Sequence, residues 1–352
     1  MLFLCSNPVV EASMRFRVMQ FFEPLARAGH FPVLSTFFRQ ERSRFMSRVA
    51  HGLATRVRDL VRSRGVDRIF IHREIMPYAW NDLVRLLPGN VPMIFDLDDA
   101  VFMATHPGWA GYVARPATTR LLVQRAELVY AGNEYLADYA SQWSRHVRVV
   151  PTVVDTGVFC PRETRPPRGR PLVGWVGSPG TTKYLSAVTA ALDDIGRTIP
   201  FDLRLVGANR DFGLKHVNVE YVPWRLEDDV RAFQELDIGL YPLEDDVWTR
   251  GKCGFKAIQY MACGVPFIAS PVGVVRNIVR EGVDGLWART ESEWRGALET
   301  LLRDAAMRAR LAKAGRARAI ERYSVQALAP SWIEGLESPR KGSAGQIDAR
   351  VS

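Results

Sequence analysis

The sequence predicts an α/β protein in which two doubly wound, Rossmann-like domains face a central cleft. Its 352 residues exceed what one hydrophobic core usually supports, so two domains of ordinary size are expected. Short apolar runs alternate with longer amphipathic stretches, which is the pattern of strands and helices in a parallel sheet. A segment rich in Arg, Pro and Gly at residues 161–171 divides this alternation into two similar halves.

The first half is predicted to form a domain at residues 1–155, followed by a linker at 156–171. Its expected strands are 2–5, 33–35, 68–72, 93–96, 128–131 and 147–150. Its expected helices are 15–28, 45–64, 117–125 and 134–142.

The second half is predicted to form a domain at residues 172–323. Its expected strands are 172–177, 202–206, 219–222, 238–240 and 266–270, and its expected helices are 184–198, 228–235, 256–262, 292–302 and 305–323. Residues 324–336 are expected to form a helix that packs back toward the first domain. Residues 337–352 are polar and are expected to be disordered. In doubly wound domains ligands bind beyond the carboxyl ends of the strands, so the site is expected in the cleft.

The composition is that of a soluble globular protein, with 47% apolar and 24% charged residues. The net charge of +9 fits a polyanion, a membrane surface or a small anionic substrate, and charge alone does not choose among them. The 4 cysteines show neither metal-ligand spacing nor the density of a disulfide scaffold. We find no leader pattern and no apolar run of membrane-spanning length. These observations predict a cytoplasmic protein.

A glycine-rich turn begins the second half. Residues 172–183, LVGWVGSPGTTK, predict a strand, a turn and the start of a helix. Glycines let backbone N–H groups approach a phosphate closely, and a helix N-terminus adds positive potential. Gly177, Ser178 and Lys183 are therefore candidate phosphate ligands. Taken alone, this segment is explained equally well as a tight strand-to-helix turn.

The clearest functional signal is the segment RGKCGFK at residues 250–256. Arg250, Lys252 and Lys256 crowd a glycine-containing turn at the predicted start of a helix, where the helix dipole disfavours cations. A diphosphate would compensate both these cations and the unpaired N–H groups near Gly254 and Phe255. A solvated charge run would more often lie along a helix face, so we favour an anion site.

The segments DIGLYPL at 237–243 and WTRGKCGFKAIQYMACGVP at 248–266 resemble the donor-site signature of one enzyme family. This family comprises the retaining group 1 glycosyltransferases, also called family-four enzymes, which have the GT-B fold. The similarity extends across residues 174–183, 206–207, 222–224 and 273–285, and it reaches 95–102 and 132–139. It therefore covers most of the chain.

The resemblance implies that a nucleotide diphosphate-sugar binds mainly to the second domain and an acceptor mainly to the first. Lys183 matches the position of the family's donor-phosphate lysine, and Gly254 and Phe255 would offer backbone N–H groups to the diphosphate. Gln259 matches the second glutamate of a paired-glutamate motif that usually holds the ribose. Val222 and Trp224 are expected on the nucleoside side. Neither a cofactor nor a metal is expected to be required.

Three departures from the family pattern indicate a sub-branch. The first glutamate of the pair corresponds to Gly251, and the second has become Gln259. Ser178 stands where the family usually has a phosphate-binding arginine. An amide binds a ribose hydroxyl without the strength of a carboxylate. Arg250, Lys252 and Lys256 could replace the missing arginine.

The candidate catalytic residues lie in the first half. Asp98 and Asp99 follow a strand and would face the cleft, where they could orient the acceptor hydroxyl. A pair of aspartates binding Mg²⁺ or Mn²⁺ is a second reading that we rank lower. His106 could bind a donor or acceptor hydroxyl, or it could be a structural residue of its loop.

Three arginines are expected near the cleft in the first domain. Arg15 and Arg17 open a helix after the first strand and could meet a donor phosphate or an acidic acceptor. Residues two apart on a helix do not share a face, so one of them is expected to face solvent instead. Arg73 ends the third strand, where its ion pair could be purely structural.

A basic amphipathic segment spans residues 39–64. Such a helix could contact anionic lipid headgroups, which would suit a lipid-linked acceptor and a peripheral location on the inner face of the membrane. We expect instead that its apolar face packs on the sheet.

The leading hypothesis is sugar transfer from a nucleotide diphosphate-sugar with retention, in bacterial polysaccharide or lipopolysaccharide assembly. A sugar-nucleotide epimerase of similar architecture is one alternative, and a binding subunit with a degenerate donor site is another. The basic residues lack interleaved aromatics or a known module, so no nucleic acid is expected as a partner.

Overall fold

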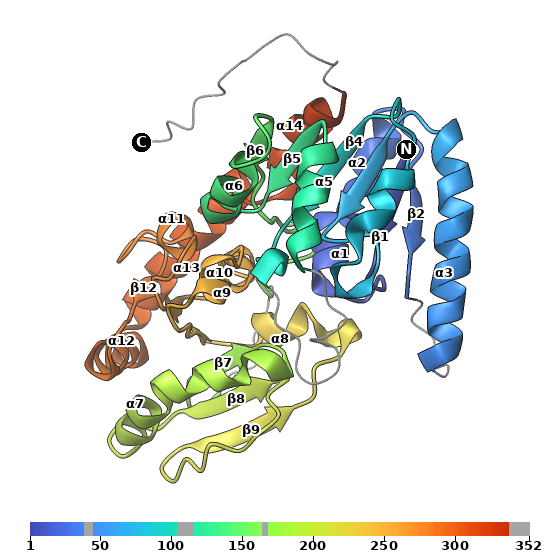
Figure 1. The fold of residues 1–352 in the computed structure, drawn as a ribbon. Helices are drawn as coiled ribbons and strands as arrows, with labels where there is room; N and C mark the ends of the chain where they lie inside the picture. Colours follow the sequence, from blue (N-terminus) through green and yellow to red (C-terminus); the bar gives the residue numbers. More distant parts are fainter. Residues whose placement is uncertain (39–44, 104–115, 164–167, 338–352) are drawn as a thin grey trace.

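The computed structural model describes residues 1–38, 45–103, 116–163 and 168–337, which form two α/β domains (Figure 1). The first domain contains a six-stranded sheet of order β2-β1-β3-β4-β5-β6, and the second a six-stranded sheet of order β12-β11-β10-β7-β8-β9. All neighbouring strands in both sheets are parallel. The predicted fold class of two doubly wound domains is confirmed.

The first domain follows the expected alternation of strands and helices. Its strands are β1 (Leu2–Cys5), β2 (Val33–Thr36), β3 (Ile69–His72), β4 (Met93–Leu97), β5 (Leu128–Ala131) and β6 (Val147–Val149). Its helices are α1 (Ala12–Arg17), α2 (Phe22–Arg27), α3 (Phe45–Arg62), α5 (Thr119–Arg125) and α6 (Glu134–Ser141).

The second domain has shorter helices next to its sheet and long ones at its end. Its strands are β7 (Leu172–Val176), β8 (Asp202–Val206), β9 (Asn218–Val222), β10 (Ile238–Tyr241), β11 (Phe267–Ala269) and β12 (Leu286–Trp287). Its helices are α7 (Ser186–Gly196), α8 (Arg231–Gln234), α9 (Val247–Arg250), α10 (Phe255–Ala262), α11 (Val275–Ile278), α12 (Glu291–Arg303) and α13 (Ala305–Arg322), and the chain continues into α14 (Val325–Glu337).

The central strands are apolar on both faces because helices cover both sides of each sheet. In β1, Leu2 and Leu4 belong to one hydrophobic core, while Phe3 and Cys5 belong to the core on the opposite face. Successive side chains of a strand point to opposite faces, so a strand buried on both sides is a continuous apolar run. This is why short apolar runs in the sequence predicted the sheets well.

Each sheet has one place where the strand order reverses. In the first sheet the chain leaves β1 for β2 on one side and then continues from β3 on the other. In the second sheet the reversal lies between β7 and β10. Such switch points open a crevice beyond the carboxyl ends of the strands, where ligands of doubly wound folds bind.

Helix α14 leaves the second domain and packs on the first (Figure 1). Its Trp332 is 1% exposed and stacks on Phe21 with ring centroids 4.4 Å apart. The hydroxyl of Tyr130 on β5 donates to the Trp332 carbonyl oxygen at 2.6 Å. The two crossings between the domains are fastened to each other, because Val154 and Ser324 form a parallel bridge.

The structure corrects the helix predicted at residues 15–28. This stretch is divided into α1, a 3₁₀ segment at Met19–Phe21, and α2. Pro24 lies in the first turn of α2, where its missing N–H is tolerated; within one continuous helix it would lack the bond to residue 20 and clash with that residue's carbonyl. The short elements α9, α11 and β12 were not predicted, since segments of four residues or fewer carry little periodicity.

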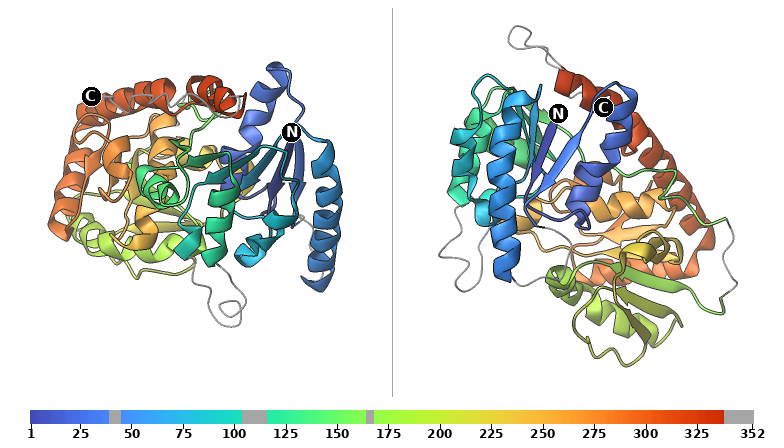
Figure 2. Two further views of the ribbon diagram at one scale, coloured as in Figure 1. Left: turned by 45° about the horizontal axis from the view of Figure 1, so that its top comes forward. Right: turned by 90° about the vertical axis from the view of Figure 1, so that its right-hand side faces the viewer.

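Helix α3 lies at the outer edge of the first domain, beside β2 and away from the second domain (Figure 2). It spans 18 residues. At 1.5 Å per residue it is about 27 Å long.

Candidate active site

A cavity of about 490 Å³ lies between the two domains, and both domains contribute to its wall. It opens at the carboxyl ends of β3 and β4 in the first domain and of β7 and β10 in the second. These are the neighbourhoods of the two switch points, so the cavity is where a ligand is expected. Residues from the first domain that line it include Arg15, Arg73, Asp98, Asp99 and Thr152, and those from the second include Gly177, Ser178, Trp224, Lys252, Gly254, Phe255, Lys256 and Gln259.

The turn between α9 and α10 brings two lysines and a helix N-terminus to this cavity. Gly254 has a φ of 64°, and a Cβ there would lie 2.3 Å from Cδ1 of Ile278, so both the backbone and the space require glycine. This conformation lets α10 begin directly at Phe255. The first N–H groups of α10 have no i→i−4 partner within the helix. Lys252 and Lys256 line the same cavity.

Lys256 is held in a partly buried position beneath the cavity. Burial, opposed by the charge of Asp229 and assisted by that of Arg15, lowers the pKa of its ammonium to about 8. Asp229 is committed elsewhere, since it forms an ion pair with Arg15 at 2.8 Å and accepts a hydrogen bond from Nε1 of Trp224 at 3.0 Å. The site therefore carries cationic charge that a bound anion would neutralise.

Gln259 lies one turn of α10 further along and is fully buried. Its Oε1 accepts a hydrogen bond from Nζ of Lys256 at 3.2 Å. Its Nε2 has no hydrogen-bond partner within the described residues, although the side chain lines the cavity. A buried amide with an unused donor is unfavourable, and a ligand oxygen would satisfy it.

The lysine-bearing turn also contacts the first domain. Asn133, which caps α6 by accepting from the Leu136 N–H, donates through Nδ2 to the carbonyl oxygens of Gly251 at 3.1 Å and Lys252 at 3.0 Å. The Cys253 thiol donates to the carbonyl oxygen of Asp98 at 3.0 Å. The position of Lys252 is thus set by the first domain as well as by its own.

Gly251 is required by the same contact. A Cβ at this position would lie 2.6 Å from Cβ of Ala100 and 3.1 Å from the Ala100 nitrogen. The backbone conformation of Gly251 is ordinary, so space alone excludes a side chain. Ala100 of the first domain therefore occupies the space that the side chain of the family's first glutamate would need.

The two acidic residues at the end of β4 differ in their surroundings. Burial tends to raise the pKa of Asp98, but the charges of Arg73 and His72 hold it well below its usual range. Burial raises the pKa of Asp99, in opposition to Arg73 and Lys252. Asp98 is therefore an ionised partner of Arg73, while Asp99 takes up a proton more readily.

Arg17 corrects the prediction that it lines the cleft. It is 2% exposed and binds the carboxylate of Asp96 through two nitrogens, and its Nη1 donates to the Val150 carbonyl oxygen at 2.6 Å. Asp96 also accepts from Nδ1 of His72 at 2.7 Å. Arg15 reaches the cavity because it lies two residues earlier on α1, on a different face.

Three more predicted ligands lie outside the cavity lining. Arg250 ends α9 and forms an exposed ion pair with Asp245 at 2.7 Å. Lys183 is exposed in the 3₁₀ segment Pro179–Leu185, with its Nζ 5.0 Å from the ring centroid of Tyr184. Val222 packs on the core of the second domain. Ser178 lines the cavity and forms a capping box with Thr181. His106 lies outside the described residues.

Sequence reasoning missed several residues of the wall. Asp229, Tyr184 and Tyr241 line the cavity, and the Tyr241 pKa is raised by burial. Tyr241 could have been found, because it ends the strand that precedes the cationic turn. Asp229 could not be predicted from its neighbours in sequence, because its partner Arg15 lies 214 residues away and its partner Trp224 lies before the helix that follows it.

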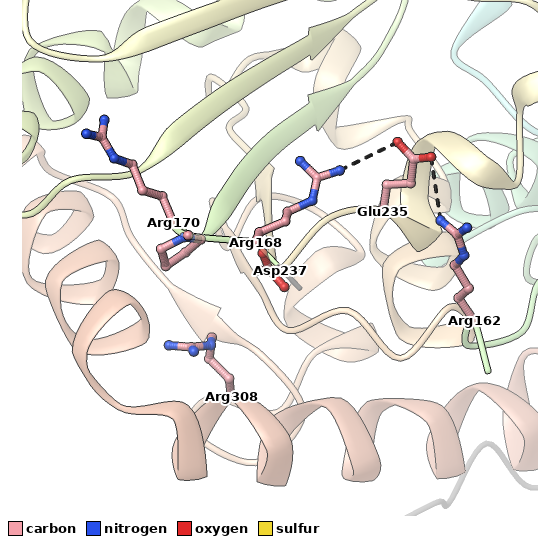
Figure 3. Close-up of a pocket in the computed structure, with 8 residues that line it drawn as sticks. Arg162, Arg168, Arg170, Glu235, Asp237 and Arg308 are labelled. Atoms are coloured by element: carbon pink, nitrogen blue, oxygen red, sulfur yellow. Dashed lines mark ion pairs between the residues drawn. The ribbon is translucent and has the colours of Figure 1, made fainter. Parts of the chain in front are cut away.

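A second cavity, of about 210 Å³, lies at the opposite ends of β7 and β10 (Figure 3). Arg162 and Arg168 approach the carboxylate of Glu235 at 3.7 Å and 4.0 Å, and Arg170 and Arg308 complete the cationic wall. Arg204 and Arg231 bind the same glutamate. This cluster joins residues of the linker to α8. Because it precedes the strands, it is separate from the crevice at their carboxyl ends.

In the described part of the chain, no group of three or more His, Cys, Asp or Glu side chains is arranged to hold a metal ion. Across those same residues, no helix combines the length and apolar character needed to span a bilayer.

Comparison with known proteins relates the second domain to one family and the whole chain to one fold. Residues 170–304 match the family model described as glycosyl transferases group 1. Sucrose-phosphate synthase from Thermosynechococcus elongatus superposes with a TM-score of 0.70 at 17% identity, covering 95% of this chain and 97% of that one. HepE from Anabaena, solved in complex with UDP and glucose, superposes with a TM-score of 0.69 at 16% identity, covering 96% and 99%. The architecture is the GT-B fold of these glycosyltransferases.

One curated relative is similar in sequence over a short stretch. It is a D-inositol 3-phosphate glycosyltransferase from Stackebrandtia nassauensis, 43% identical over 61 residues, which are 17% of this chain and 14% of that protein. The matched family segment contains the cationic turn and Gln259. The family match and the fold together support a glycosyltransferase of the group 1 type.

Proposed function

We propose that the protein transfers a sugar from a nucleotide diphosphate-sugar to an acceptor hydroxyl in the cavity between its domains. The observation that carries the proposal is the convergence of Lys252, Lys256 and Arg15 at the N-terminus of α10. Cations gathered at the positive end of a helix are stabilised by a bound anion, and a diphosphate matches that requirement.

The cationic turn would act on the leaving group. As the bond between sugar and diphosphate breaks, negative charge grows on the diphosphate, and Lys252, Lys256 and the first N–H groups of α10 are placed to stabilise it. The contacts of Asn133 and Cys253 keep the domains together around the donor, which would exclude water and protect the activated sugar from hydrolysis. Gln259, with its unused Nε2 donor, is proposed to bind an oxygen of the nucleotide.

Asp99 is proposed to orient the acceptor hydroxyl. Its raised pKa makes it a better proton acceptor than Asp98, whose carboxylate is stabilised by Arg73. Lys183 stays a predicted donor-phosphate ligand, since it lies in the segment that follows Gly177 and Ser178 at the cavity.

The finer features of the reaction are proposals of the same kind. Retention of configuration and independence from a metal are proposed from the group 1 resemblance. A uridine nucleotide is the first donor to test, because HepE was solved with UDP. Polysaccharide or lipopolysaccharide assembly in the cytoplasm or at the inner face of the membrane, with a lipid-linked glycan as acceptor, is the proposed setting.

The test is a thermal-shift panel of nucleoside diphosphates and nucleotide sugars. We expect at least one uridine compound to raise the unfolding temperature. We expect Lys252→Ala to abolish that shift and Lys313→Ala, an exposed lysine on α13, to leave it intact. Equal shifts in the wild type and in Lys252→Ala would refute the site.

One observation favours a second candidate function, a binding subunit without catalysis. Gly251 is packed against Ala100, so no carboxylate can stand where the family motif has its first glutamate. Slow hydrolysis of the bound sugar nucleotide without acceptor, in which water takes the sugar and UDP is released, separates the two. Measurable release supports the transferase, while tight binding with no release supports the binding subunit.

A further inference from the structure

Helix α3 turns its polar face inward and its apolar face outward, which reverses the predicted packing. Thr55, Arg56 and Asp59 are buried, with Arg56 only 2% exposed. Met46 is 72% exposed, Val57 64% and Val61 65%. Surface helices normally bury their apolar stripe, so the reversed orientation of α3 needs a structural explanation.

The cause is the buried Arg56, whose bonds to residues outside the helix fix the rotation of α3. Nη1 of Arg56 binds Asp59 at 2.7 Å and Ser35 on β2 at 3.2 Å, and Nε donates to the Ile75 carbonyl oxygen at 2.8 Å. Nη2 donates to the carbonyl oxygen of Cys5 on β1. A rotation that buried the apolar stripe would carry Arg56 and Asp59 away together and break their bonds to Ser35, Ile75 and Cys5. Losing several buried hydrogen bonds at once is unfavourable.

A close contact on the same inner face adds to this lock. A Cβ on Gly52 would lie 2.5 Å from Cε1 of Phe37, so the helix backbone is pressed against that ring. The inner face is therefore fully specified by polar contacts and close packing. The apolar stripe is held rigidly toward the outside.

The outward face combines an apolar stripe with positive charge. Met46, Leu53, Val57 and Val61 recur at intervals of seven or four residues, so they lie on one side of the helix. Arg58, Arg62 and Arg64 are exposed beside the C-terminal half of the stripe. Asp59 is the one acidic residue of α3 and it is buried. The exposed face therefore has cations and no carboxylate.

We propose that α3 lies in the surface of an anionic lipid bilayer and docks the first domain there. An amphipathic helix with an apolar stripe flanked by arginines binds in the interface plane, with its stripe among the acyl chains and its cations at lipid phosphates. The position of α3 at the outer edge of the molecule leaves this face open to a flat surface (Figure 2). The charge pattern disfavours a second copy of the chain, because a twofold contact through this face would oppose arginines to arginines.

The test is co-sedimentation of the full chain with vesicles of phosphatidylglycerol and phosphatidylcholine, compared with phosphatidylcholine alone. We expect binding to the anionic vesicles and a loss of at least tenfold in Val57→Asp/Val61→Asp. Arg58→Gln and Arg62→Gln should each weaken partitioning about fivefold, since a cation near an anionic surface contributes about 1 kcal/mol.

A matched control separates this surface from a general charge effect. Val158→Asp/Val283→Asp places the same charges at valines that are 55% and 42% exposed elsewhere, and it should bind like the wild type. Far-UV circular dichroism would show that both double variants fold. Equal binding of the two double variants would overturn the proposal, as would absence of binding to anionic vesicles. Dimerisation of the wild type that depends on protein concentration and is lost only in Val57→Asp/Val61→Asp would also overturn the proposal. It would show that this face of α3 binds a second copy of the chain. Vesicle binding is measured without a sugar donor, so it does not depend on the proposed transfer reaction.

Discussion

Replacing Lys256 by methionine should stabilise the unliganded protein while abolishing anion binding. Burial lowers the pKa of Lys256 from 10.5 to about 8. One pKa unit corresponds to about 1.4 kcal/mol, so holding this charge at neutral pH lowers the free energy of unfolding by roughly 3 kcal/mol. Methionine keeps an unbranched side chain of similar length without the charge, so Lys256→Met should recover up to that amount.

The effect should depend on pH with a definite sign. Between about pH 8 and 10.5 the unfolded chain retains the Lys256 proton while the folded protein has released it. The free energy of unfolding of the wild type therefore rises with pH across this window through this group. The variant lacks that rise, so its advantage should be largest below pH 8 and shrink toward pH 10.5.

The assay is urea unfolding followed by tryptophan fluorescence at both ends of this window, with a UDP thermal shift at neutral pH. Lys313→Met is the matched control, because Lys313 is exposed on α13. We expect only Lys256→Met to be stabilised and to lose the UDP shift. If Lys256→Met is no more stable than the control, the charge of Lys256 does not destabilise the unliganded protein. If it keeps the UDP thermal shift, Lys256 does not bind the diphosphate.

Three further predictions concern the contacts around the cavity. Gly251→Ala should weaken donor binding and lower the unfolding temperature, because the added methyl group would clash with Ala100 at a cost of about 1–3 kcal/mol. A second substitution, Ala100→Gly, should restore part of both. Arg17→Met should lower the free energy of unfolding by about 3–5 kcal/mol in urea, because it leaves the fully buried Asp96 without its arginine. Asn133→Ala should destabilise by about 1 kcal/mol through the lost cap of α6 and also weaken UDP binding in calorimetry, whereas Thr290→Ala, the cap of α12, should affect stability alone.

The sequence specified the sheets and the cationic turn because both are local. Strands buried on two faces are continuous apolar runs, and the glycines and lysines of residues 251–256 lie next to one another in the chain. Local pattern could not show which cations reach the cavity. Arg250 is taken up by Asp245, and Arg17 by Asp96, which lies 79 residues away in sequence.

The orientation of α3 shows the same limit. Its apolar stripe is plain in the sequence, and the usual inference is that such a stripe packs inward. The inner face is decided by the bonds of Arg56 to Ser35, Cys5 and Ile75, which lie on other elements. No periodicity within residues 45–62 contains that information.

The bridge between Val154 and Ser324 determines how the two halves of the molecule can move. The chain crosses between the domains twice, and the Val154 N–H donates to the Tyr323 carbonyl oxygen while the Val325 N–H donates to the Val154 carbonyl oxygen, each at 3.0 Å. Two crossings bound side by side form one hinge, so rotation about it is the expected motion between the domains. Opening the cavity by rotation about this hinge would therefore break the interdomain hydrogen bonds of Asn133 and Cys253 and the ion pair between Arg15 and Asp229.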